Sequence, residues 1–157
     1  GWDNEHKKDD VMIFETKYMA NGATEYFISI ESRDREIIFG FLRLRLTNTP
    51  TLSILKNCAL IQELHVYGPV KEVFAESNYN SSQHYGFGKK LMKYAEYICL
   101  LNGYSKVSVI SGVGVRNYYR KLGYELKETF MIKTIVNTEL VTIFLFIFVA
   151  IVYNFLI

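Results

Sequence analysis

Apolar and polar positions alternate in two stretches of the N-terminal half, residues 25–31 and 36–46, which a polar turn at 32–35 joins. Alternation with a period of two, rich in β-branched and aromatic residues, predicts a β-hairpin. In the second stretch, Leu42, Leu44 and Leu46 lie on one face of the predicted strand. Arg43 and Arg45 lie on the other face. We favour a solvated face for the arginine pair over an RNA contact.

The middle of the chain predicts further strands and two helices. Residues 58–67 form an apolar third strand, and a polar loop at 68–82 follows it. Residues 89–101 have apolar positions three or four apart, which is typical of an amphipathic helix. The later elements are a strand at 106–110 parallel to the third strand, a short helix opening at 111–114 and ending at Leu122, and a last strand at 124–133. The predicted class is α/β, with a mixed central sheet and flanking helices.

The C-terminal residues Leu140–Ile157 are almost all apolar, and they carry no charged side chain and no polar face at helical spacing. A helix that is hydrophobic on all sides is buried in protein or in lipid. About 18 residues at ~1.5 Å each span roughly 27 Å, which is close to the thickness of a bilayer core. We therefore expect a C-terminal transmembrane helix at 134–157, preferred over a buried core helix. It would act as a tail anchor that leaves the preceding domain in the cytosol.

The composition excludes few classes of ligand or site. The 157 residues carry a formal net charge of +2, which neither demands nor excludes nucleic acid. The only two cysteines, Cys58 and Cys99, fall in apolar runs and are predicted to be buried. No zinc-like spacing of cysteines is present, so no metal site is predicted.

A glycine turn precedes the predicted helix, with the sequence Gln83-His84-Tyr85-Gly86-Phe87-Gly88 followed by Lys89. Free amides at the start of a helix, together with the helix dipole, favour anions. The spacing differs from the dinucleotide fingerprint and from the P-loop, so NAD and ATP are poor candidates. The turn predicts a diphosphate site, and coenzyme A is the preferred ligand. For His84 we prefer a loop-stabilising or solvent-facing role.

A second motif, Tyr119-Arg120-Lys121-Leu122-Gly123-Tyr124, lies near the end of the predicted domain. With the glycine turn and the order of elements, it resembles the GNAT superfamily of acetyl-CoA-dependent N-acetyltransferases. Three longer segments, residues 59–68, 83–88 and 109–124, are similar to the acetyltransferase domain of the Elongator catalytic subunit family. That resemblance covers about residues 18–133.

The resemblance implies roles for several residues. Acetyl-CoA would bind along the third strand and at the glycine turn, and this set comprises Glu63, Leu64, His65, Val66, Gln83, Gly86, Phe87, Gly88, Lys89 and Tyr119. Tyr119 would protonate the departing thiolate of coenzyme A. Glu63 would activate the attacking amine or water, with His65 as its competitor. Because Glu63 and His65 are two residues apart, they share one face of their strand.

The family implies a domain that contributes to carboxymethyl modification of the wobble uridine of tRNA. The iron–sulfur cluster and S-adenosylmethionine would belong to a radical domain, whose three-cysteine motif this chain lacks. Asn117 stands where we expect His in many relatives, so the resemblance implies no role for that position. Two alternatives remain open, a protein lysine acetyltransferase at a membrane and a non-catalytic acetyl-CoA- or tRNA-binding module.

The expected organisation is a polar segment at 1–16, the GNAT domain at 17–133 and the anchor at 134–157. The expected partners are acetyl-CoA, tRNA through the full-length protein, other Elongator-like subunits and a membrane. The expected location is the cytosolic face of the mitochondrial outer membrane or of the endoplasmic reticulum.

Overall fold

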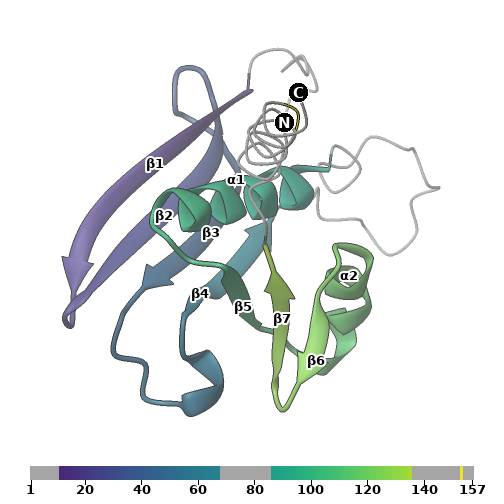
Figure 1. Cartoon of the computed structure of the whole chain (residues 1–157). Helices are drawn as coiled ribbons and strands as arrows, with labels where there is room; N and C mark the ends of the chain where they lie inside the picture. The colour runs from purple at the N-terminus through teal and green to yellow at the C-terminus, as the bar shows by residue number, and fades with distance from the viewer. Residues whose placement is uncertain (1–10, 68–85, 136–152, 154–157) are drawn as a thin grey trace.

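A computed structural model describes residues 11–67, 86–135 and 153. These residues form a seven-stranded mixed sheet in the order β1-β2-β3-β4-β5-β7-β6, with the helix α1 lying across one face (Figure 1). The predicted α/β class with a mixed sheet is confirmed. Among the described residues, no helix is both long and apolar enough to cross a bilayer. The predicted anchor lies almost wholly outside the described residues, although Thr134 ends β7 and Ile135 is buried.

Three antiparallel strands form one half of the sheet: β1 (Val11–Ala20), β2 (Ala23–Ser32) and β3 (Ile38–Leu46). The hairpin β2–β3 was predicted. The strand β1 was not, and the expected domain boundary at residue 17 falls inside it. Asn21 and Gly22 join β1 to β2, both with positive φ (48° and 70°), as a two-residue hairpin turn requires.

The other half of the sheet is built around a crossover connection. The strand β4 (Cys58–Val66) runs parallel to β5 (Lys106–Ile110), and α1 (Phe87–Leu101) lies between them in the sequence. This pairing confirms the predicted parallel strands. A short 3-10 turn, η1 (Ser53–Leu55), precedes β4.

The C-terminal elements differ from the prediction in one respect. After η3 (Val113–Val115) and the short helix α2 (Arg116–Lys121), the chain forms β6 (Glu125–Lys127) and β7 (Phe130–Thr134). The prediction of a single strand over 124–133 was wrong, because the chain reverses at Glu128, whose φ is 55°. The two short strands pair antiparallel, and β7 also pairs with β5.

The hydrophobic core lies between α1 and the sheet. Leu91, Met92 and Ala95 of α1 are fully buried, and they pack in one cluster with residues of β2, β3, β4 and β5. Both Tyr119 and Tyr124 belong to this cluster, so α2 and the strand after it are fixed against α1. Cys58 and Cys99 are buried and free, as predicted.

Candidate acyl-coenzyme A site

The strands β4 and β5 separate part-way along their length. Their ladder runs from Cys58–Lys106 to Ile61–Val109, whereas β4 continues to Val66 and β5 ends at Ile110. The side of β4 that faces β5 therefore has no strand partner beyond Ile61 among the described residues. An extended ligand can add to such an unpaired strand edge through backbone hydrogen bonds.

A β-bulge lies at the same point of β4. Arg43 of β3 pairs with Glu63 and Leu44 pairs with Ile61, so Gln62 has no counterpart on β3. The Gln62 side-chain oxygen is buried and has no hydrogen-bond partner, and the Ser111 hydroxyl, just after the end of β5, is in the same condition. Buried polar atoms are normally hydrogen-bonded, so unpartnered ones next to an open strand edge are candidates for ligand contacts.

The four β4 residues predicted to bind the cofactor divide between the two faces of the sheet. Leu64 and Val66 pack against the core on the α1 side. Glu63 and His65 share the opposite face, as the alternation predicts. There Glu63 lies 3.9 Å from Arg43, and the His65 ring stacks on Phe41 at 5.8 Å.

The start of α1 has the geometry that the glycine turn predicts. Gly86 is the N-cap residue, with φ of 68°, and the first helical hydrogen bond runs from the Lys90 amide to the Gly86 carbonyl at 3.0 Å. The amides of Gly88 and Lys89 precede that bond, so they have no partner within the helix. The predicted contacts of Gln83, and the loop position of His84, lie outside the described residues.

Three elements meet at Gly88. A Cβ atom added there would lie 2.6 Å from the Tyr118 hydroxyl and 3.5 Å from Val66 Cγ2. The end of β4, the start of α1 and a phenol from α2 are therefore in contact. Phe87 is 3% exposed and its ring packs against Phe39 at 5.7 Å, so its side chain belongs to the core and not to the ligand site.

The tyrosine predicted to be catalytic, Tyr119, lies deeper than its neighbour. It is 5% exposed, and its ring packs edge-on against Tyr118 at 5.2 Å. Burial raises the pKa of the Tyr119 phenol. Burial also raises the pKa of Tyr118 to about 12, with a smaller contribution from Tyr119. Both phenols therefore remain protonated at neutral pH and can donate a proton.

Tyr118 was missed by the sequence reasoning, which selected only the tyrosine that matches the motif. The structure brings Tyr118 and Tyr119 to the α1 side of the sheet, whereas Glu63 and His65 are on the other side. The separation of β4 from β5 lies between these two groups of residues. The described residues contain no cluster of three metal-ligating side chains.

Known proteins resemble this chain in both sequence and fold. No family model matches. Elongator complex protein 3 is 43% identical over 128 residues in Bos taurus and 42% identical over 132 residues in Saccharomyces cerevisiae, matches that cover 80% and 81% of this chain. The chain spans about a quarter of the length of these relatives, 23% and 24% respectively.

Solved structures extend the comparison. Elp3 of the archaeon Methanocaldococcus infernus, with its N-terminus deleted, matches with a TM-score of 0.73 and 37% identity, over 82% of this chain and 31% of that chain. A GNAT-family acetyltransferase from Desulfovibrio desulfuricans matches with a TM-score of 0.54 and 13% identity, over 71% of this chain and 69% of its own. The chain has a GNAT fold. It is homologous, over about 80% of its length, to one part of Elongator complex protein 3. Within this GNAT domain, the edge of β4 and the start of α1 form the candidate site.

Proposed function

We propose that this chain is an acetyl-CoA-dependent acyltransferase domain of an Elongator-type enzyme. Its homologues and the GNAT-family structures support acetyl-CoA as the acyl donor. One observation carries the proposal. The unpaired edge of β4, the start of α1 with the amides of Gly88 and Lys89, and the Tyr118 phenol meet around Gly88.

In this proposal each part of the site has one role. The amides of Gly88 and Lys89 bind the diphosphate of coenzyme A at the positive end of the α1 dipole. The edge of β4 from Gln62 to Val66 binds the pantetheine arm, and a β4 amide polarises the thioester oxygen. The side chains of Gln62 and Ser111 supply further polar contacts to that arm.

The chemistry is acyl transfer to water or to an amine. The acceptor atom bonds to the acetyl carbon and loses a proton to Glu63, while the bond between that carbon and sulfur breaks. The departing thiolate takes a proton from Tyr118 or Tyr119, whose phenols are protonated at neutral pH. The products are coenzyme A and either acetate or an acetylated amine.

Within the proposal, the acetyl group, or the acetate released from it, is then used for carboxymethylation of the wobble uridine of tRNA. The radical step and its iron–sulfur cluster would reside in a separate domain. The homology to Elongator complex protein 3 supports this assignment. A lysine acetyltransferase would instead turn over with peptides and without tRNA.

Thiol release from acetyl-CoA tests the proposal directly. The full chain is assayed with and without tRNA, and Glu63→Gln is compared with Glu125→Gln, which alters an exposed carboxylate on β6. We expect tRNA to increase release, Glu63→Gln to lower it about 100-fold, and Glu125→Gln to leave it unchanged. Release that depends on peptides and ignores tRNA would favour the lysine acetyltransferase. Binding without any release would favour a binding module.

We also propose that the apolar residues 140–157 anchor the domain to the cytosolic face of an intracellular membrane. The support is the sequence of this segment, which carries no charged side chain and is apolar except for Thr142 and Asn154. Flotation with liposomes tests it, comparing the full chain with a chain that ends at Ile135. We expect only the full chain to float, and flotation of neither would contradict the proposal.

A further inference from the structure

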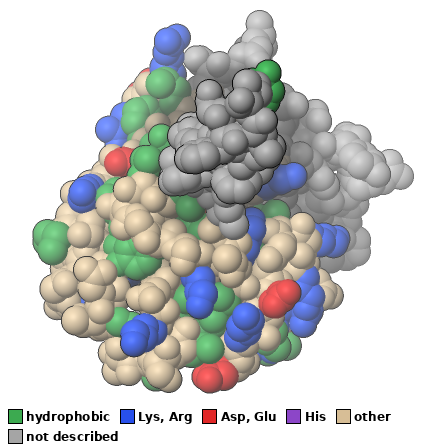
Figure 2. Space-filling model, viewed as in Figure 1, with side chains coloured by type: hydrophobic (Ala, Val, Ile, Leu, Met, Phe, Trp, Pro, Cys, Tyr) green, Lys and Arg blue, Asp and Glu red, His purple; other side chains and the backbone are tan. Residues whose placement is uncertain are grey.

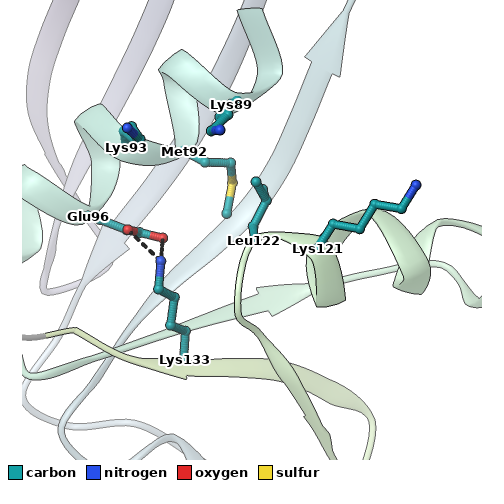
Figure 3. Close-up of a pocket in the computed structure, with 7 residues that line it drawn as sticks. All are labelled: Lys89, Met92, Lys93, Glu96, Lys121, Leu122 and Lys133. Atoms are coloured by element: carbon teal, nitrogen blue, oxygen red, sulfur yellow. Dashed lines mark hydrogen bonds and ion pairs between the residues drawn. The ribbon is translucent and has the colours of Figure 1, made fainter. Parts of the chain in front are cut away.

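A basic pocket lies beside the candidate site, between α1 and the segment from α2 to β7 (Figure 3). It has a volume of ≈ 170 Å³ and is lined by four lysines and a single acid, which are Lys89, Lys93, Lys121, Lys133 and Glu96. Met92, which is 1% exposed, forms part of its floor. Basic side chains are spread over this face of the molecule, with only isolated acidic ones among them (Figure 2).

The acid in the pocket is already engaged. Both Glu96 oxygens lie 3.0 Å from Lys133 Nζ, and the Tyr124 hydroxyl donates to Glu96 at 2.8 Å. Lys121 extends away from this group in Figure 3. No ion pair of Lys89 or Lys93 occurs among the described residues, so the pocket has unbalanced positive charge at α1.

Lys89 and Lys93 destabilise α1 where they stand. Lys89 and Lys93 are four residues apart on α1, where like charges repel. Lys89 also lies in the first turn, where the helix dipole disfavours cations, and that turn contains no acidic residue. A bound anion would offset both effects.

The pocket continues from the proposed diphosphate site. Lys89 belongs to both, and the seven helical steps from Gly86 to Lys93 span about 10 Å along the helix axis. A ligand whose diphosphate sits at the start of α1 can therefore place a second phosphate beside Lys93. We propose that this pocket binds the 3′-phosphate monoester of coenzyme A, an inference that rests on the proposed acetyl-CoA function.

The test is a cycle of ligand and side-chain changes, measured by calorimetric titration of the full chain. Coenzyme A and dephospho-coenzyme A are titrated into the wild type, Lys93→Gln and a control variant. The control is Lys56→Gln, which alters an exposed lysine that does not line the pocket. We expect the wild type to bind coenzyme A at least tenfold more tightly than the dephospho form. Lys93→Gln should remove most of this preference and leave the affinity for dephospho-coenzyme A unchanged, whereas Lys56→Gln should change neither.

The contrary outcomes are distinguishable. Equal binding of both ligands by the wild type, or equal weakening of both by Lys93→Gln, would overturn the 3′-phosphate assignment and leave the acetyl-CoA function standing. Binding of neither ligand by the folded chain would overturn both. A further arm titrates adenosine 3′,5′-bisphosphate and an RNA oligonucleotide. A Lys93-dependent affinity for the RNA alone would assign the pocket to an RNA phosphate and overturn the inference.

Discussion

The Tyr118 hydroxyl lies against Gly88, only 2.6 Å from the point that the Cβ of an alanine at that position would occupy. Glycine at the start of α1 therefore accommodates a phenol supplied by α2. The contact joins the proposed diphosphate site to a candidate proton donor.

Gly88→Ala tests this contact through a double-mutant cycle with Tyr118→Phe. Alanine stabilises a helix by about 1 kcal/mol over glycine, but here the phenol hydroxyl must move to admit the methyl group. We expect Gly88→Ala to be neutral or destabilising in the wild type and stabilising in the Tyr118→Phe background. Urea unfolding of the four proteins measures the coupling. Additive effects would show that the two residues do not touch.

The raised pKa values of Tyr118 and Tyr119 make stability fall at high pH. Burial raises the pKa of Tyr118 to about 12 and also raises that of Tyr119, whereas an unfolded tyrosine titrates near 10. Above pH ~10 the unfolded chain releases these protons and the folded chain keeps them, so the free energy of unfolding decreases as pH rises. Urea unfolding between pH 8 and 11 should show this loss, and Tyr118→Phe should reduce its slope. The exposed control Tyr97→Phe should not, and an equal slope in both variants would contradict the assignment.

Lys89→Gln should stabilise the ligand-free domain and weaken its binding of acetyl-CoA. It removes a cation from the positive end of α1 and relieves repulsion with Lys93, which together amount to about 0.5–1 kcal/mol. We expect a slightly higher Tm without ligand and a weaker affinity for acetyl-CoA. Thermal unfolding and calorimetric titration measure the two effects. A lower Tm without ligand would indicate that Lys89 has a structural role instead.

Gln62→Leu separates a binding role from a structural one. The Gln62 side-chain oxygen is buried without a partner, and such a group costs about 1–3 kcal/mol. Replacing the amide with an apolar group of similar size should leave stability unchanged or raise it, while weakening the binding of acetyl-CoA. Ser111→Ala is the companion variant, with the same expected direction. A clear loss of stability in either variant would mean that the polar atom serves the fold.

The sequence predicted much of this arrangement because its signals are local. Alternation at Leu42 and Leu44 identified the core face of β3, and the glycine turn located the start of α1. The strand β1 was missed because most of its residues are exposed on an edge and lack alternation, although Asn21-Gly22 is a strong hairpin signal. The β6–β7 reversal at Glu128 was missed because a left-handed glutamate has no sequence signature.

The parts of the site that depend on long-range placement could not be predicted. The contact between Tyr118 and Gly88 joins residues 30 positions apart. On a helix, Tyr118 and Tyr119 point about 100° apart, so only their packing shows which one meets α1 and which one enters the core. The bulge at Gln62 depends on its register with β3, and the basic pocket depends on α1 lying next to β7.

The central claim is that acetyl-CoA binds along β4 and at the start of α1. Amide chemical shifts of the isotope-labelled full chain in detergent, recorded as acetyl-CoA is added, test it most directly. We predict that the amides of Phe87, Gly88 and Lys89 shift most, together with those of Leu64 to Val66. A folded chain whose shifts do not change, or change only at other residues, would contradict it.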